Sequence, residues 1–429
     1  MLATGAGTAY YFYASAVAEQ RLEKAIAEAD RLEPGWRVDD VLRKQRRLPD
    51  KDNGAFQRTA VEQMLAGWRL PRPISAAPQI QLTEEQTASL RANLQGVAAA
   101  LEAARKLAHA PDGSQPLTWT PPRFTNGFQP MRALEVGKFL SMDAMLLAQD
   151  SKLEQALASC RAILGDARTL GNGPDLMTCL VRTALDALAV TALERILAQG
   201  EASETALADL QEVLGEEAAQ PLYLNAFRGQ RALTDRMFEA LNKGEMKVTD
   251  LFPAKSPSWL RPGRVGPEEI MYLIRAGSIT NNRAAHLEMS TRLIEIAKLP
   301  DRDRARHIEA LKDQLKDQPL LARQFLVIFC KYQIDVEQDQ VKLRLAIAGI
   351  AAERYRLAHG SWPGLWRPLS PSTLPAYRMI PLRTHRYGCS AWTGSSGFNR
   401  PGLLAREFSL CGTLRPAGKF CRKKLHRRN

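Results

Sequence analysis

Residues 176–199 read LMTCLVRTALDALAVTALERILAQ, and this stretch decides the fold class. The helix breaker Gly171-Asn172-Gly173-Pro174 precedes it. Its bulky aliphatic side chains recur at helical spacing and form one wide apolar face: Leu176, Leu180, Leu185, Leu188, Leu193 and Ile196. A helix with so wide an apolar face is expected to lie among other helices.

Helical periodicity continues on both sides, and no window of alternating β-branched residues competes with it before residue 360. Further helices are predicted at Leu134–Gln149, Leu153–Leu170, Glu204–Leu214, 217–242, 267–276, 280–298, 303–314, 318–332 and 335–359. The pairs 131–170 and 174–215 have the size of stacked helical hairpins, although no motif repeats. We predict an all-α fold, a solenoid-like array of stacked helical hairpins.

Short helices are predicted to alternate with Pro- and Gly-rich breaks in the N-terminal third. The breaks fall at Pro34-Gly35, Pro49–Gly54, Leu70–Pro78 and 110–130. Thr83-Glu84-Glu85-Gln86 has the spacing of a capping box, in which two side chains accept hydrogen bonds from backbone N–H groups at a helix start. The helix that follows is predicted to continue to about His109.

Residues 1–18 carry no charged side chain and include the aromatic run Tyr10-Tyr11-Phe12-Tyr13. A helix of that length spans about 27 Å, just under the roughly 30 Å hydrocarbon layer of a bilayer. Aromatic residues near its charged end are typical of a membrane interface. The segment has few strongly apolar residues, so we expect a truncated membrane anchor. An ordinary N-terminal helix and the remnant of a signal peptide are the alternatives.

The net charge of +13 is concentrated at the C-terminal end. Residues 365–429 contain 13 Lys and Arg and a single acid, Glu407, whereas the other 364 residues contain 46 bases and 45 acids. Three of the six cysteines, Cys389, Cys411 and Cys421, also lie in this segment. So abrupt a change of composition marks a boundary, and the body before it is close to neutral.

The histidines do not form a ligand pattern. His286-Leu287-Glu288 and His307-Ile308-Glu309 put His and Glu on different sides of a helix, whereas a zinc protease needs two His four residues apart on one face. Surface or capping roles are predicted for all six: His109, His286, His307, His359, His385 and His426.

Cysteines, glycines and paired carboxylates give no site either. Cys160, Cys179 and Cys330 are predicted to be small core residues, and the C-terminal cysteines form no C-x-x-C pair with which a zinc site could begin. Gly5-Ala6-Gly7 lacks the third glycine of a dinucleotide-binding loop. Acid pairs at predicted helix starts offset the helix dipole: Asp39-Asp40, Glu84-Glu85, Glu216-Glu217 and Glu268-Glu269. The sequence therefore assigns no catalytic, cofactor-binding or metal-ligating residue and no cofactor.

Residues 351–363, AAERYRLAHGSWP, form the most specific string of the chain: a helix that ends at Gly360, followed by a turn. This string resembles a segment of uncharacterised membrane-anchored helical proteins of planctomycete-type bacteria. Residues 25–37, AIAEADRLEPGWR, are similar to the same family, as is, less specifically, Leu180-Val181-Arg182. The resemblance covers about residues 10–363. It implies an N-terminal membrane helix, an exported α-helical body and no assigned activity.

From Gly364 onward the chain departs from that family, whose members continue with a string like S-L-x-x-L-V-P-E-Y-L-x-x-V-P-x-D-P-F. Codons for residues 369–374 allow V-P-E-Y-L in the neighbouring reading frame, and those for residues 376–381 allow V-P and D-P at the same spacing. We hypothesise a frameshift near codon 364. The alternative is a genuine, disordered basic tail that binds nucleic acid or anionic lipid. Sequencing the gene across this codon distinguishes the two.

Four regions follow: a membrane-anchor helix and stalk at 1–33, a helical segment with Pro-rich linkers at 34–130, an α-helical body at 131–363, and the basic tail at 364–429. The leading hypothesis is a non-catalytic, membrane-tethered helical scaffold that contacts the membrane through its N-terminal helix and binds an unidentified protein partner. It would be single-pass in a bacterial inner membrane, with its body on the periplasmic side. Nucleic-acid binding through the basic tail and an enzyme with a site between helices are the alternatives.

Overall fold

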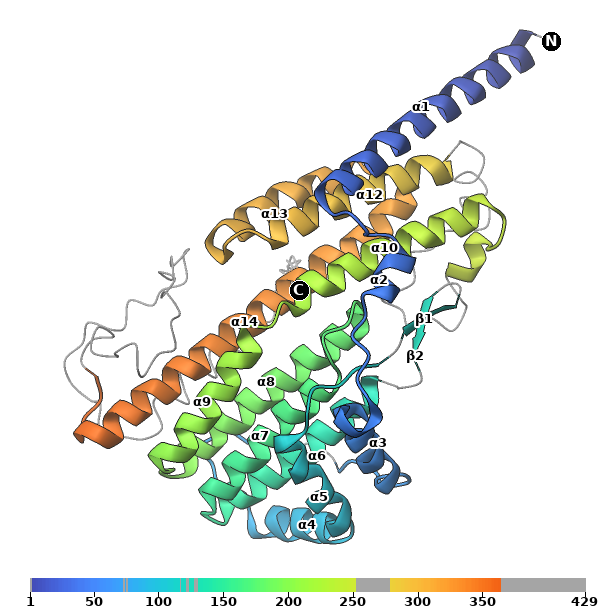
Figure 1. The fold of residues 1–429 in the computed structure, drawn as a ribbon. Coiled ribbons are helices and arrows are strands. Elements are labelled where there is room, and N and C mark those ends of the chain that lie inside the picture. Colours follow the sequence, from blue (N-terminus) through green and yellow to red (C-terminus); the bar gives the residue numbers. More distant parts are fainter. Residues whose placement is uncertain are drawn as a thin grey trace, which may run out of the picture.

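The computed structural model describes residues 2–71, 74, 76–115, 117–120, 123–126, 130–251 and 278–363. These residues form the predicted all-α fold (Figure 1). Its α-helices are α1 (Leu2–Leu32), α2 (Val38–Arg43), α3 (Gly54–Met64), α4 (Glu84–Gln95), α5 (Ala98–Arg105), α6 (Pro130–Gln149), α7 (Leu153–Thr169), α8 (Leu176–Gln199), α9 (Glu204–Ala218), α10 (Leu222–Asn242), α12 (Ser278–Ala297), α13 (Asp301–Leu315) and α14 (Leu320–His359). Short 3-10 helices lie at Asp50–Asp52, Lys106–His109 and Val248–Leu251.

One antiparallel hairpin interrupts the helical pattern. Strand β1 (Leu117–Thr120) pairs with β2 (Arg123–Asn126), with Leu117 opposite Asn126. It lies within the connection predicted at 110–130, where no strand was expected. Leu117-Thr118-Trp119-Thr120 contains β-branched and aromatic residues, but the run is too short for a periodicity signal.

The largest hydrophobic core lies among α4 to α9. Helices α6, α7 and α8 pack against one another there. The fully buried side chains include Phe139 from α6, Ile163 and Leu164 from α7, and Leu185 from α8. The bounds of α8 coincide with the predicted stretch, and Leu185, Leu193 and Ile196 of its apolar face are buried in this core.

A second core joins α10, α12, α13 and the first part of α14. Phe227, Leu293, Leu326 and Phe329 are buried in it. Helix α14 has 40 residues, about 60 Å at the usual rise, and its C-terminal part carries Ile350 into the first core. In Figure 1 this long orange helix runs along both groups of helices.

Helix α14 bears on two predictions. The break predicted between residues 332 and 335 is absent, because no Gly or Pro lies between Leu320 and Ala348 and the chain continues as one helix. The solenoid-like stacking of hairpins is not confirmed either, because α14 packs against α8 and α9 as well as α12 and α13 rather than against one neighbouring pair.

Local signals at helix ends were more reliable. The capping box at Thr83 is formed, with both its hydrogen bonds to Gln86. Gly35 has φ +72° in the break after α1, and Gly360 has φ +70° after α14, a conformation that favours glycine. The prediction of one helix that continues to about His109 is wrong, because Gly96 and Val97 separate α4 from α5.

Among the described residues, α8 is the one helix whose length and composition would suffice to cross a membrane. It is an internal helix packed against α6, α7 and α14, not the N-terminal helix. Helix α1 lies against α12 along its C-terminal part and projects beyond the body at its N-terminal end (Figure 1).

Candidate functional site

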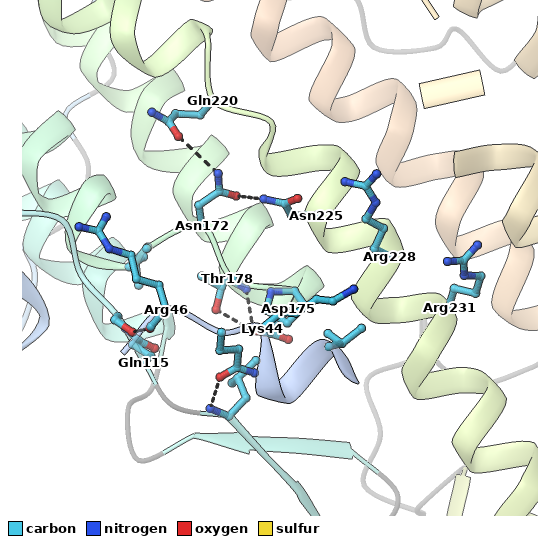
Figure 2. A pocket seen from close by; sticks show the side chains of 18 of the residues that line it. Lys44, Arg46, Gln115, Asn172, Asp175, Thr178, Gln220, Asn225, Arg228 and Arg231 are labelled. Carbon is cyan, nitrogen blue, oxygen red and sulfur yellow. Dashed lines mark hydrogen bonds between the residues drawn. The ribbon is translucent and has the colours of Figure 1, made fainter. Parts of the chain in front are cut away.

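A cleft of about 660 Å³ lies where the segment after α1 meets the body (Figure 2). Its walls come from residues 32–46, residues 112–115 with Leu117, the loop at 170–175, the first half of α8 and the first half of α10, with Lys298 after α12. These segments are far apart in the sequence, so the fold assembles the cleft.

Two loops in the cleft wall approach each other at glycine. The amide of Gly113 donates to the carbonyl of Arg168 at 3.0 Å. A Cβ on Gly113 would lie 1.6 Å from the carbonyl oxygen of Thr169. Gly171 has φ +77°, and a Cβ there would lie 2.5 Å from the carbonyl oxygen of Gly113. Only glycine fits at these two positions, which fixes this side of the cleft.

Glu33 follows the last residue of α1 and holds three cations. Arg228 donates to Glu33 Oε1 from Nε at 2.8 Å and from Nη2 at 2.6 Å, and Arg231 donates to Oε2 at 2.9 Å. Lys298 lies 3.0 Å from Oε1. Burial on its own would raise the pKa of Glu33, but hydrogen bonds from Arg228 and Lys298 and the charges of both arginines lower it to about 2. The carboxylate therefore stays ionised and ties α1 to α10 and α12.

The turn after Glu33 is packed on the same cluster. The ring of Trp36 is buried, and the guanidinium of Arg231 lies 5.3 Å from its centroid. Trp36 Nε1 donates to Asp30 at 3.0 Å. Because Gly35 turns the backbone, Lys44 Nζ reaches the carbonyl oxygens of Gly35 at 3.0 Å and Pro34 at 3.4 Å. Lys44 therefore stands at the cleft wall (Figure 2).

A row of amide side chains crosses the cleft. Asn225 Nδ2 donates to Asn172 Oδ1 at 2.9 Å, and Asn172 Nδ2 donates to Gln220 Oε1 at 3.3 Å (Figure 2). The row joins the loop after α7 to the start of α10. It presents polar groups to any molecule in the cleft without adding charge.

Beneath the cleft lies a buried ion pair. Arg182 donates to both carboxylate oxygens of Glu217, at 2.5 and 2.7 Å, and to the carbonyl of Gly171 at 2.9 Å. Glu217 was predicted at a helix start, which is wrong: α9 continues to Ala218, so Glu216-Glu217 is at its C-terminal end. Nearby Asp186 is fully buried, and burial first and Glu217 second raise its pKa well above the ordinary value. Both effects favour the neutral form of the Asp186 carboxyl, and Glu217 is the carboxylate that pairs with Arg182.

The second notable surface is the N-terminal part of α1. We call residues 2–17 the outer half and residues 18–32 the inner half. Tyr10, Phe12 and Tyr13 are 71%, 67% and 69% exposed, and Val17 is 47% exposed. No charged residue lies in the outer half. Large apolar and aromatic side chains exposed on a helix that leaves the body make the outer half a candidate interaction surface.

One histidine prediction is wrong. His286 is fully buried, surrounded by the rings of Phe238, Phe325 and Phe329 at centroid distances of 5.9, 6.2 and 5.8 Å. Burial, with a smaller effect of Arg231, lowers its pKa to about 3, so the ring is neutral. Helix periodicity places His286 on the face toward α10 and α14, and packing there outweighs its polarity.

The other described candidates lie as predicted. His109, His307 and His359 are exposed. Cys160, Cys179 and Cys330 are buried core residues, and burial raises the pKa of each thiol. The acid pairs Asp39-Asp40 and Glu84-Glu85 occupy the first turns of α2 and α4. Gly5 and Gly7 lie within α1. The remaining candidates lie outside the described residues: Glu268-Glu269, His385, His426, Cys389, Cys411 and Cys421.

Within the described ranges, no three His, Cys, Asp or Glu side chains lie close enough together to hold a metal ion. Comparison of the chain with protein-family models, curated proteins and solved structures gives no match. Sequence reasoning missed Glu33, Lys44 and Arg228 as cleft residues. The Pro34-Gly35 break indicated a turn at this position, but the local sequence does not show which distant cations lie around that turn.

Proposed function

We propose that this protein is a helical scaffold tethered to a membrane, and that the outer half of its helix α1 enters the lipid bilayer. The observation that carries the proposal is the exposure of Tyr10, Phe12 and Tyr13 on an uncharged helical segment. In the proposed arrangement the body lies on the periplasmic side of a bacterial inner membrane, as the family resemblance implies.

The chemistry of the outer half supports a lipid partner. Tyr and Trp side chains place an apolar ring in the acyl region and a polar group at the headgroups, so they are enriched at membrane interfaces. Two of the three exposed aromatics, Tyr10 and Tyr13, have this character. The first charged residue is Glu19, beyond the outer half. A segment of sixteen uncharged helical residues can therefore enter the interface without burying a charge.

Contacts of the inner half are consistent with a rigid connection between the proposed membrane anchor and the body. Arg21 binds Glu288 of α12 through two hydrogen bonds, at 2.9 and 2.7 Å, and Glu33 binds three cations of α10 and α12. Ala25 and Ala29 are buried against Leu287. A pull on the outer half would therefore be transmitted to the body through packed contacts rather than a flexible linker.

Vesicle flotation tests the proposal. The full chain is mixed with vesicles of phosphatidylethanolamine and phosphatidylglycerol, and the fraction that floats is measured. Replacing Tyr10, Phe12 and Tyr13 by Ser should reduce binding by about tenfold or more, because several apolar side chains lose their burial in lipid. The control replaces Met64, Ile80 and Met131, three exposed apolar residues of the body, by Ser. Equal flotation of both variants, or no flotation of the parent, would overturn the proposal.

A further inference from the structure

We propose that the cleft between residues 32–46 and α10 binds a small organic molecule through a phosphate or carboxylate group, held by Lys44 and Arg228. This site goes beyond the proposed tether, because it lies on the body and needs no membrane. The inference rests on the charges, the donors and the size of the cleft.

Basic side chains outnumber acids around the cleft. Six bases line it: Lys44, Arg46, Arg182, Arg228, Arg231 and Lys298. Three carboxylates line it: Glu33, Asp112 and Asp175. Glu217 and Glu295, outside the lining, also pair with Arg182 and Lys298. One base still remains in excess, so the local field favours an anion.

Lys44 is the base that no acid neutralises. Its Nζ contacts the carbonyl oxygens of Pro34 and Gly35, and among the described residues it makes no ion pair with a carboxylate. The side chain is exposed to the cleft opening. An ammonium held by two neutral acceptors is available to an anionic ligand.

Arg228 supplies a second donor group. Its Nε and Nη2 both bind Glu33, while its Nη1 has no partner among the described residues. The Arg228 side chain is 39% exposed, whereas Arg231, the other arginine that binds Glu33, has no exposed side-chain surface. A guanidinium that is fixed on one edge and open on another is suited to an oxyanion.

Buried donors without acceptors point to the same ligand chemistry. Arg231 has no exposed side-chain surface, and its Nε is buried without a hydrogen-bond partner. Gln45 accepts a hydrogen bond from the amide of Leu117 through Oε1, but its Nε2 is buried without a partner. Both residues line the cleft. Buried polar atoms without a partner are uncommon, and two donors in one cleft favour a ligand rich in acceptors.

The start of α10 adds to this field. Pro221 precedes α10 and provides no side-chain hydrogen bond to its first turn, and that turn contains no acid. Gln220 and Asn225, on either side of the helix start, line the cleft. By contrast, Asp175 caps α8 by accepting from the amides of Met177 and Thr178. The α10 amides therefore keep the partial positive charge that attracts anions.

The size and wall of the cleft favour an organic anion over a bare ion. About 660 Å³ falls in the range of small-molecule sites. Leu32, Trp36, Val41, Leu117 and Leu170 give the cleft an apolar part beside its basic part. A ligand with a compact apolar portion and one anionic group matches both.

Titration of the full chain with three ring compounds tests the inference. Phenyl phosphate and benzoate carry the two anionic groups, and benzyl alcohol is the neutral analogue. We expect at least one anion to bind about tenfold more tightly than benzyl alcohol, since charge-assisted hydrogen bonds are lost in the neutral compound. Binding of phenyl phosphate alone identifies a phosphate site, and binding of benzoate alone a carboxylate site. Equal binding of all three compounds, or of none, would overturn the inference.

Matched variants locate the binding. Lys44→Gln should lower the affinity for the anion by about tenfold, because a neutral amide replaces an ammonium. Lys138→Gln removes the same charge from an exposed position on α6 outside the cleft and should leave the affinity unchanged. Thermal unfolding without ligand checks that both variants are folded. Equal loss of affinity in the two variants would show non-specific attraction and contradict the site.

Discussion

The two halves of α1 belong to one continuous helix, yet their surroundings are opposite. Along the inner half, Ala18, Ala25 and Ala29 are buried, and their small side chains let the helix lie close to α12. Along the outer half, Tyr10 and Tyr13 are exposed. The comparison shows that side-chain size differs between the two halves: small alanines lie where the helix packs on the body, and large aromatic side chains lie where it is exposed.

The largest expected effect comes from breaking the anchor of the inner half. Glu33→Gln removes the carboxylate shared by Arg228, Arg231 and Lys298 and should lower the free energy of unfolding by about 3–5 kcal/mol, because the buried guanidinium of Arg231 loses its charged partner. Urea unfolding measures it. Glu23→Gln, an exposed position on the same helix, should have little effect. Equal stabilities of the two variants would show that the inner half is not anchored by charge.

A second substitution tests the close packing of the inner half. Ala29 has no exposed surface and contacts the cluster of Trp36 and Leu287. Ala29→Leu should reduce the free energy of unfolding by about 1–3 kcal/mol through overpacking. Ala27→Leu, two residues away on the exposed face, is the control and should be nearly neutral. If Ala29→Leu were tolerated as well as the control, α1 would not lie closely on α12.

Low pH should weaken the attachment of the inner half to the body, because Glu33 becomes protonated. Its pKa is about 2 in the fold and 4.5 for an ordinary glutamate, so its stabilising effect is present above pH 4.5 and is lost as the pH falls toward 2. The slope due to this group is at most about 1.4 kcal/mol per pH unit. Urea unfolding at a series of pH values should show this slope in the parent and a shallower one in Glu33→Gln. Identical slopes would assign the acid sensitivity to other groups.

The smallest expected effect on stability belongs to the outer half. Replacing Tyr10 and Tyr13 by Ser should change the free energy of unfolding by less than about 0.5 kcal/mol, because both side chains are exposed. Urea unfolding without lipid measures it. A loss comparable to that of Ala29→Leu would mean that the outer half packs on the body in solution and is not reserved for a membrane.

The sequence was informative where contacts are local. The bounds of α8 follow from its apolar face and the breaker before it, and Asp175 caps it as a helix start requires. The capping box at Thr83 and the turn at Gly360 are likewise set by residues within one turn. The predicted break near residue 333 failed because a polar stretch without Gly or Pro can continue a helix when both of its ends are packed.

The cleft could not be predicted because its residues meet only in the fold. Glu33 and Lys44 come from residues 32–46, Arg228 and Arg231 from α10, and Lys298 from the residue after α12. Nothing in their spacing shows that one carboxylate gathers three cations. His286 was misassigned for a related reason: polarity suggests a surface residue, while aromatic rings from α10 and α14 surround it. In both cases long-range packing outweighs the local pattern.

Hydrogen exchange of the α1 amides, with and without vesicles, tests the division of this helix most directly. In solution, amides of the inner half should exchange slowly and those of the outer half rapidly, because Ala25 and Ala29 of the inner half are buried, whereas Tyr10 and Tyr13 of the outer half are exposed. Vesicles of phosphatidylethanolamine and phosphatidylglycerol should slow exchange in the outer half and leave the inner half unchanged. Equal protection of both halves without lipid, or no added protection of the outer half with lipid, would contradict the account.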